Sequence, residues 1–453
     1  MIDTKSAKAR FLSHAFQGQL VAFSRQEIQN DTLENLHRKQ KNYSPVSESE
    51  YLINTPSNWN WSRLGYVTSN HGQIIPNEDF CYIDVGTLDN VHQRLSETEN
   101  IVSSKDAPSR ARKVVQDGDV LYSTVRPYLH NICVVDRQFS RMPIASTAFC
   151  VMQPDNTVLL NKFLFYWLLT PEFDKFSNGD PSKGTLYPAI GEKDLLHGVI
   201  PIPSLAEQAL IIERIESVFS VLDTIDNLQS QYFYNQAILK EKLIDAAIRG
   251  KLTEQLPEDG NAEELYQQIQ EEKKALIKAG KMKKEKPLSE IKEEEMPFII
   301  PNNWKWIPLG RLICIESGKG LTASEMKPGK IPVYGGNGIT GYNNCGFVQK
   351  GTIVIGRVGY YCGSVHITTQ ESWVTDNAFI TTYPENCVDK RFLAHVLRYL
   401  KLGQNNNGSA QPVVSGKKIY PLPFPLPPIA EQKRIAAKLD ELLNKIEMEK
   451  INV

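Results

Sequence analysis

A long, uninterrupted helical stretch constrains the fold of this chain more than any other feature. Residues 206–252 contain no proline, and their first glycine is Gly250. Apolar residues recur there in the alternating four- and three-residue spacing of a coiled-coil seam. The seam consists of Ile211, Ile215, Val218, Leu222 and Ile225, and continues through Gln229, Tyr232, Gln236, Leu239, Leu243 and Ala246. Such a helix would be on the order of 65 Å long. Because one helix cannot bury this seam alone, it needs a partner.

The partner is supplied by an internal repeat. Residues 201–208 (PIPSLAEQ) match residues 425–432 (PLPPIAEQ) at an offset of 224 (430 − 206). Residues 243–252 (LIDAAIRGKL) match residues 11–20 (FLSHAFQGQL) at an offset of 232 (250 − 18). The two ends of the chain therefore predict a second long helix, antiparallel to the first, in a pseudo-twofold circular arrangement with adjacent termini. Two unrelated amphipathic helices are the alternative, which the matched flanks disfavour.

Composition limits the class of protein. At 453 residues the chain can form two or three domains with proper cores. No apolar run approaches the roughly 20 residues of a membrane span, and residues 1–11 lack a signal-peptide core. The seven cysteines are scattered without a CxxC pair, which favours reduced thiols and a cytoplasmic location over a disulfide framework or zinc ribbon. The net charge of −1 does not itself indicate a nucleic-acid ligand.

A second repeat stands at the start of each of two globular regions, and we call it the entrance of the region. Residues 56–65 (PSNWNWSRLG) recur as residues 301–310 (PNNWKWIPLG), and the alternating tryptophans predict an edge strand with one packed face. The alternative is that these tryptophans stack on bases. After each entrance come strand and turn patterns, an apolar helix (161–169 and 389–402) and a glycine-containing loop. A proline-rich PxPxxAEQ segment follows (201–208 and 425–432), which we call the strap, and it leads into a long helix.

The polar stretches outside the globules carry weaker signals. Residues 21–55 predict a short helix near 27–38 and a loose segment at 43–51. Residues 271–296 nearly balance their charges and predict a solvated helix with a flexible linker, in preference to a DNA-binding arm.

The predicted fold is α+β, with two α/β globular domains separated by long antiparallel coiled-coil helices. The expected divisions are an N-terminal helical segment (1–55), a first globular domain (56–200), a central helical region (201–300), a second globular domain (301–424) and a C-terminal helix (425–453).

Catalytic motifs are absent from the sequence. There is no GxxxxGK[ST] phosphate loop, no HExxH, no Cys/His metal cluster, no Asn/Asp-Pro-Pro-aromatic tetrapeptide and no arguable Ser/His/Asp triad. Residues 336–341 match GxGxxG, but the following YNNCGFVQKG cannot form the helix that a dinucleotide site needs, so a glycine turn is expected. Two similar globules with different loops on a repeated frame suit a non-catalytic, bivalent reader.

The motifs resemble those of the specificity subunits of type I restriction–modification systems. The resemblance is carried by residues 331–339 (IPVYGGNGI), 356–363 (GRVGYYCG), 375–379 (TDNAF), 408–412 (GSAQP), both PxPxxAEQ straps and residues 243–252. It implies that each globule (56–200 and 301–424) is a target recognition domain that reads one half of a bipartite DNA target. It also implies that the helices set the spacer and dock two methyltransferase subunits, with restriction subunits joining the complex. S-adenosylmethionine, ATP and Mg²⁺ would be bound by those partners, and none by this chain.

Side chains that hydrogen-bond base edges are the candidates for DNA contact. In the first globule they are Arg126, Tyr128, His130, Lys183, Thr185 and Tyr187, and in the second Asn337, Arg357, Tyr360, Ser409 and Gln411. For each, a loop-stabilising bond or a phosphate contact is the alternative. Candidates for contact with a methyltransferase subunit are Glu207, Gln208, Glu431 and Gln432, although capping of the helix N-terminus is the favoured role.

Two other classes remain open. The chain could itself be a DNA methyltransferase or nuclease, which the missing motifs oppose and an activity assay on the isolated chain would test. It could also be a coiled-coil scaffold, which the two elaborated globules oppose and a gel shift with its partner would test.

Overall fold

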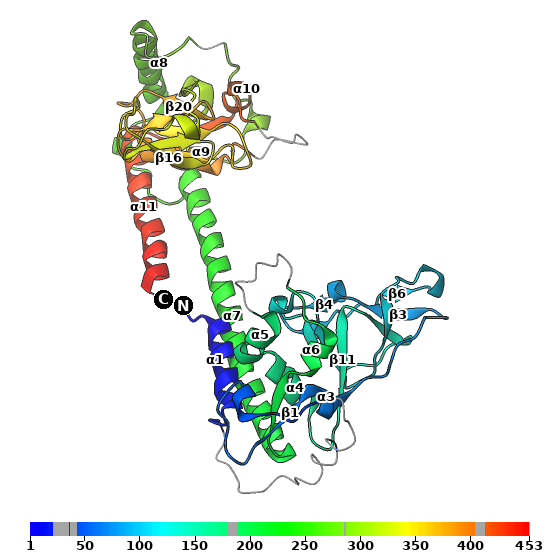
Figure 1. Cartoon of the computed structure of the whole chain (residues 1–453). Coiled ribbons are helices and arrows are strands. Elements are labelled where there is room, and N and C mark those ends of the chain that lie inside the picture. Colours follow the sequence, from blue (N-terminus) through cyan, green and yellow to red (C-terminus); the bar gives the residue numbers. More distant parts are fainter. Residues whose placement is uncertain (21–35, 37–42, 180–187, 285–286, 404–412, 453) are drawn as a thin grey trace. The chain divides into compact units, whose positions relative to one another are not determined.

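The computed structural model describes residues 1–20, 36, 43–179, 188–284, 287–403 and 413–452. It divides into two compact units, residues 1–230 and 231–453, each of mixed helix and sheet (Figure 1). The short helix expected near residues 27–38 falls almost wholly outside the described residues. None of the helices in these ranges combines the length and apolar character that crossing a bilayer requires.

The predicted long helix is present as α7, Leu205–Ile248, 44 residues long. Along the seam Ile211 and Ile215 are fully buried and the other positions are partly buried, except Leu239, which is exposed. The heptad spacing therefore identified the buried face of α7 correctly.

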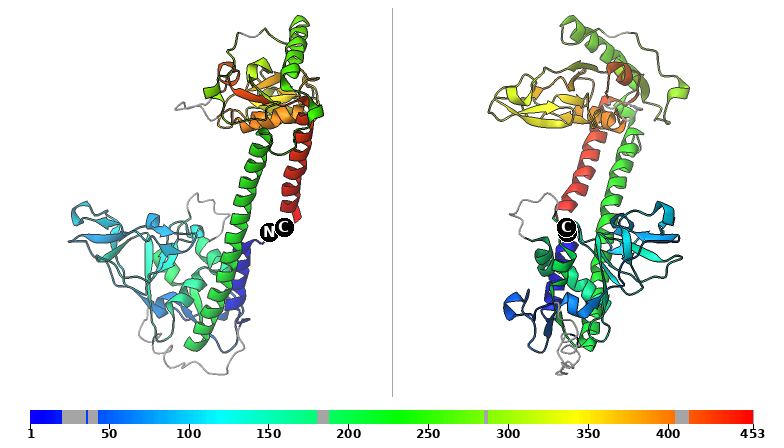
Figure 2. Two further views of the ribbon diagram at one scale, coloured as in Figure 1. Left: turned by 180° about the vertical axis from the view of Figure 1, so that it is seen from behind. Right: turned by 45° about the vertical axis from the view of Figure 1, so that its right-hand side comes forward.

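Each half of α7 is covered within its own unit by a helix from one end of the chain (Figures 1 and 2). In the first unit α1, Thr4–Phe16, runs antiparallel to α7: the main-chain N–H of Ile2 donates to Gln229 (2.8 Å) and the Thr4 hydroxyl to Asp226 (3.1 Å). In the second unit α11, Ile429–Asn452, packs along α7, where Lys240 pairs with Glu447 (3.1 Å). The two termini thus supply the partners that the repeat predicted. The twofold relation and the adjacency of the termini stay predictions.

Both copies of the 232-residue repeat end their helix in the same way. Gly18 and Gly250 adopt left-handed backbone with φ of 73° and 70°. The N–H of each bonds back to the carbonyl three residues earlier, at Ala15 and Ala247. This is the glycine-dependent helix terminus expected of such a sequence.

The first unit contains two four-stranded sheets, in the orders β6-β3-β10-β7 and β2-β11-β8-β9. Its strands are β1 Asn60–Arg63, β2 Thr68–Ser69, β3 Phe80–Ile83, β4 Leu88–Asp89, β5 Arg94–Leu95, β6 Ile101–Val102, β7 Ala111–Val114, β8 Val120–Ser123, β9 Ile132–Val134, β10 Pro143–Ser146, β11 Phe149–Pro154 and β12 Val199–Ile202. Its remaining helices are α3 Leu64–Val67, α4 Asn161–Leu168, α5 Pro171–Asn178 and α6 Glu192–Leu196.

The second unit repeats this plan, with sheet orders β16-β15-β19 and β14-β20-β17-β18. Its strands are β13 Lys305–Pro308, β14 Cys314–Ser317, β15 Ile331–Gly335, β16 Gly338–Asn343, β17 Ile353–Gly356, β18 Val365–Ile367, β19 Trp373–Val374, β20 Ala378–Thr382 and β21 Pro423–Leu426. Its other helices are α8 Ala262–Lys278, α9 Lys390–Tyr399 and α10 Gly416–Ile419. Each unit contains one parallel strand pair, β3 with β10 and β15 with β19, in otherwise antiparallel sheets.

Each entrance strand pairs with the strap of its own unit. β1 is antiparallel to β12, with Trp61 opposite Pro201, and β13 is antiparallel to β21, with Trp306 opposite Pro425. The straps are therefore strands, which their prolines concealed. Proline is tolerated because a two-stranded sheet leaves an edge on which no donor is needed.

The glutamine of each AEQ motif locks the strap to the globule. In the first unit Gln208 accepts the N–H of Leu160 (2.8 Å) and donates to the carbonyls of Pro203 (3.0 Å) and Val158 (2.7 Å). In the second, Gln432 accepts the N–H of Asp389 (3.0 Å) and donates to the carbonyl of Pro427 (2.9 Å). Both side chains are fully buried, so these bonds replace water at the start of α4 and α9.

The segments before the entrance strands are more ordered than expected. Residues 43–53 are held by Arg63, whose guanidinium donates to Glu50 (2.7 Å) and to the Ser44 carbonyl (3.1 Å). In the second unit α8 begins at Ala262 and buries a stripe of Ala262, Leu265, Ile269 and Lys273 against the core. The prediction of a solvated helix holds for residues 271–278, which are helical and exposed or partly exposed apart from buried Lys273; the apolar stripe lies mainly before that window.

Replacing Gln432 by alanine should destabilise the second unit by about 2–4 kcal/mol, since it leaves the Asp389 N–H and the Pro427 carbonyl buried without partners. Hydrogen exchange of residues 389–399 at increasing urea measures this change. Lys433→Ala, at the exposed next position, should change stability by less than about 0.5 kcal/mol. Equal effects of the two substitutions would contradict the lock.

Candidate nucleic-acid interface

Five of the eleven candidate DNA-contacting residues lie on equivalent loops of the two units. The sheets β2-β11-β8-β9 and β14-β20-β17-β18 have the same strand order. The loop from β8 to β9 contains Arg126, Tyr128 and His130, and the loop from β17 to β18 contains Arg357 and Tyr360. We call these the first and second hairpin loops.

Each hairpin loop is bonded to the chain segment that leads into the strap. In the first unit the N–H of Ile190 donates to the carbonyl of Thr124, and in the second the N–H of Val414 donates to the carbonyl of Arg357, both at 2.9 Å. Isolated bridges join Val125 to Ala189 and Val358 to Val413. The other predicted site residues, Lys183, Thr185, Tyr187, Ser409 and Gln411, precede these bonded segments and lie outside the described residues.

These equivalent bonds and bridges show which residues of the two hairpin loops correspond to each other. They align Thr124 with Arg357, so the arginines 126 and 357 are not equivalent. Arg126 and His130 are left-handed, with φ of 50° and 51°, and Gly359 and Gly363 occupy the same two places with φ of 100° and 86°. The loops therefore share one backbone course with different side chains. The first unit holds two non-glycine residues where the second uses glycine, an arrangement that stores backbone strain.

The register identifies a residue that the sequence analysis missed. Tyr361 lies two residues after Gly359, as Tyr128 lies two residues after Arg126, and both rings are exposed (57% and 46%). Tyr360, which was predicted, is 88% exposed and packs edge-on against Tyr361 with ring centroids 5.0 Å apart. The signal in the sequence was the spacing of the two glycines, which becomes readable only once the left-handed positions are known.

The second hairpin loop lies against the turn between β15 and β16. A Cβ at Gly336 would stand 2.3 Å from the carbonyl oxygen of Val358, so glycine permits this close approach. Asn337 is exposed on the turn, which confirms that the GxGxxG sequence is a hairpin turn. The guanidinium of half-buried Arg357 donates to Ser317 Oγ (3.0 Å) and lies over the ring of Phe379 (5.5 Å). The structure thus brings Asn337, Arg357 and Tyr360 onto adjoining loops.

In the first hairpin loop, His130 is an anchor. Its Nε2 lies 2.9 Å from Asp174 Oδ1, and Asp174 also accepts from Asn178 Nδ2 (2.7 Å). The main-chain N–H of Arg126 donates to the Pro188 carbonyl (2.9 Å). The imidazole nitrogen that faces α5 is therefore occupied within the unit, while Tyr128 remains presented to solvent.

The four predicted partner contacts are buried within their own units. Glu207 accepts from the N–H (3.1 Å) and hydroxyl (2.9 Å) of Ser204 and closes a capping box on α7. Glu431 accepts from Trp304 Nε1 (2.8 Å) and Gln255 Nε2 (3.0 Å). Gln208 and Gln432 form the strap locks. With at most 3% of any of these residues exposed, they have no surface to offer a second protein.

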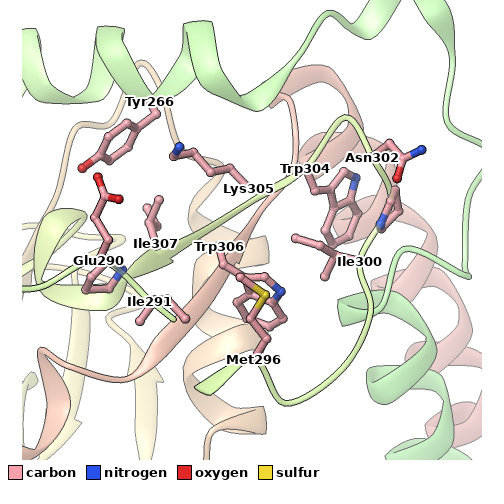
Figure 3. Close-up of a pocket in the computed structure, with 12 residues that line it drawn as sticks. Tyr266, Glu290, Ile291, Met296, Ile300, Asn302, Trp304, Lys305, Trp306 and Ile307 are labelled. Atoms are coloured by element: carbon pink, nitrogen blue, oxygen red, sulfur yellow. The ribbon is translucent and has the colours of Figure 1, made fainter. Parts of the chain in front are cut away.

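The entrance tryptophans are structural. Trp59, Trp61, Trp304 and Trp306 are at most 9% exposed, which rules out stacking on bases. Trp304 and Trp306 line a cavity of about 410 Å³ between α8 and β13 (Figure 3). At its edge Lys305 pairs with Glu263 (2.6 Å) and lies over Tyr266 (5.5 Å). Within the described ranges, no three His, Cys, Asp or Glu side chains are grouped to hold a metal.

The family is established by comparison with known proteins. A model described as "Type I restriction modification DNA specificity domain" matches residues 56–231 and again residues 301–453, which together cover most of the chain. The chain therefore belongs to the family of type I restriction–modification DNA specificity proteins. The two matches correspond to the two copies of the entrance strand, globule and strap.

Relatives and a solved structure agree with this assignment. The chain is 22% identical to the type I restriction enzyme EcoAI specificity subunit of Escherichia coli, over 90% of this chain and 81% of that protein. It is 26% identical to the EcoDI specificity subunit of Escherichia coli over 55% and 54% of the two chains. A chain from a structure concerned with complex assembly and conformational transition of the type I R-M system superposes with a TM-score of 0.67 at 22% identity, over 88% of this chain and 93% of that one. At that identity the superposition establishes the fold.

Gly359→Ala should destabilise the second unit by about 1–2 kcal/mol, because alanine strains a backbone with φ of 100°. No atom lies within 4 Å of the added Cβ, so the effect isolates the backbone. Gly320→Ala also adds a Cβ into open space but at an ordinary φ, and it should have almost no effect. Urea denaturation measures both, and an unchanged stability of the first variant would refute the left-handed register.

Proposed function

We propose that this chain is the DNA-recognition subunit of a type I restriction–modification complex and that each unit reads one half of a bipartite target. The observation that carries the proposal is the pair of hairpin loops, which share one backbone course and present different side chains. Arg357 suits guanine, whereas its counterpart Thr124 does not supply a bidentate donor. Two loops so matched in place and so different in chemistry suit two different half-sites.

In this proposal the chain recognises DNA and catalyses nothing. Methyltransferase subunits bind S-adenosylmethionine and modify the target, and restriction subunits bind ATP and Mg²⁺. The chain acts in the cytoplasm, where its DNA is found. The support is the family membership together with loops built from hydrogen-bonding and aromatic side chains.

A surface for the methyltransferase subunits is available on α7. Leu210, Val221 and Leu228 are exposed by 46%, 58% and 59%. Their spacings of 11 and 7 residues return to the same side of an α-helix, so they lie along one stripe of its surface, with Arg214 and Ser217 between Leu210 and Val221, separate from the seam covered by α1. We assign this stripe, in place of the buried AEQ side chains, to methyltransferase docking.

The reading function is tested by methylome sequencing of cells that express the chain with its neighbouring methyltransferase. A methyladenine motif in two parts with a fixed spacer is expected. Exchange of residues 56–200 for those of a relative should change one half of the motif only, and Tyr361→Ala should weaken selection at the other half. A soluble complex that leaves methylation unchanged would favour a scaffold.

The docking stripe is tested by Val221→Lys combined with Leu228→Lys. Two desolvated charges should weaken binding of the methyltransferase subunit by more than tenfold, about 1.4 kcal/mol, in sedimentation or calorimetric titration. Asn227→Lys adds charge to another exposed face of the same helix and should leave binding intact. Unchanged affinity of the double variant would place the interface elsewhere.

A further inference from the structure

The second unit contains another cavity, of about 510 Å³, between the segment that follows α8, the start of β14 and the short helix α10. Its floor is apolar and includes Leu288, Ile313, Ile315 and Tyr420. Lysines 284 and 417 stand at its rim. The cavity is far larger than a water site and lies within the range of volumes that hold a ligand or a large side chain.

The rim carries net positive charge. Of the lining lysines, Lys283 pairs with Glu316 (3.2 Å) and buried Lys273 donates to the carbonyl of Gly310 (2.5 Å). Across the described part of the chain, no carboxylate pairs with Lys284 or Lys417. An occupant with acidic groups would therefore complete the electrostatics of this site.

The first unit shows what fills the equivalent place. Leu288 corresponds to Tyr43 at the 245-residue offset of the entrance repeat. The carbonyl of Tyr43 accepts from the Tyr66 hydroxyl, and the carbonyl of Leu288 accepts from the guanidinium of Arg311 (2.8 Å), at the matching position. Each side chain also lies on the glycine of its own entrance motif: a Cβ at Gly65 would stand 2.2 Å from Tyr43 Cζ, and one at Gly310 would stand 2.6 Å from Leu288 Cδ1.

The ring of Tyr43 closes the site in the first unit. It packs edge-on against Tyr66 and His197, with ring centroids 5.4 Å and 5.0 Å apart. His197 corresponds to Pro421, which lines the open cavity of the second unit. In the second unit Leu288 is shorter, and Tyr420, which corresponds to Leu196, also lies on Gly310; the cavity opens beside these two side chains.

The charge around this place also differs between the copies. Lys417 corresponds to Lys193 at the 224-residue offset. Lys193 lies between Glu192 and Asp194, whereas Lys417 lies between Gly416 and Lys418. The segment around Lys417 is therefore more basic than the corresponding segment around Lys193.

We propose that the cavity beside α10 is a docking site for a partner protein that inserts one large apolar side chain from an acidic segment. The apolar floor accepts the side chain, and Lys284 and Lys417 bind the flanking carboxylates. A buried anchor surrounded by complementary charge is the usual form of such a contact. DNA phosphates would use the lysines but gain nothing from the enclosed apolar floor, so the cavity favours a protein ligand.

The test measures binding of a fluorescein-labelled heptapeptide, a central tyrosine with three acidic residues on each side, to the full chain by fluorescence polarisation. Saturable binding is expected, with at least tenfold weaker binding of the same peptide carrying alanine at its centre. Leu288→Tyr transfers the ring of the first unit into the cavity and should abolish binding. Lys284→Glu combined with Lys417→Glu should also abolish it, whereas Lys193→Glu, the matched change in the first unit, should not.

Outcomes that overturn the proposal are distinct. Absence of saturable binding, or full binding by a Leu288→Tyr variant with an unchanged thermal unfolding midpoint, rules out the apolar socket. If Leu288→Tyr fails to fold, the two lysine substitutions and the alanine peptide still decide the matter. Binding of a 20-base-pair duplex that depends on Lys284 and Lys417, without peptide binding, would identify the lysines as phosphate contacts instead.

Discussion

The apolar seam of α7 is the constraint on which both units depend. A helix with such a seam is stable only when another helix covers it. In the first unit the covering helix α1 inserts Leu12, Ala15 and Phe16 into the globule core. The ring centroids of Phe16 and Trp167 are 5.2 Å apart there. In the second unit Ile435 and Leu439 of α11 enter the core that contains Phe392. The helices and the globule of each unit therefore share one core, and covering the seam also completes the globule.

The sequence predicted this frame well because the segments that form it each occur twice in the chain. The heptad spacing located the buried face of α7, the match of residues 11–20 with residues 243–252 predicted that the N-terminus supplies a partner helix, and the match of residues 56–65 with residues 301–310 located both entrance strands. Repetition removes the ambiguity of a single short motif, since a match in both copies must serve the same local geometry. The glycine turn at residues 336–341 was also predictable, because the residues after it cannot continue as a helix.

What could not be predicted depends on contacts between segments far apart in sequence. The straps read as irregular because proline hides their pairing with the entrance strands. The apolar stripe of α8 lies mostly before residue 271, where the predicted helix was taken to begin. Residues 43–53 are held in place by Arg63, which only folding of the chain brings near them. In the hairpin loops, backbone bonding pairs Arg357 with Thr124 and not with Arg126. Side-chain identity is a poor guide to register where the shared feature is a left-handed backbone.

The strap locks have a consequence for how such proteins diversify. Gln208 and Gln432 bind the globules through main-chain groups alone, an N–H at the start of α4 or α9 and carbonyls nearby. Main-chain groups are common to all sequences, so these two locks make no demand on the side chains of the globule, whereas the shared core still requires apolar side chains on α4 and α9. A gene segment that encodes a globule with different loops but the same core-facing side chains can then be inherited in one recombination event without compensating changes in the frame.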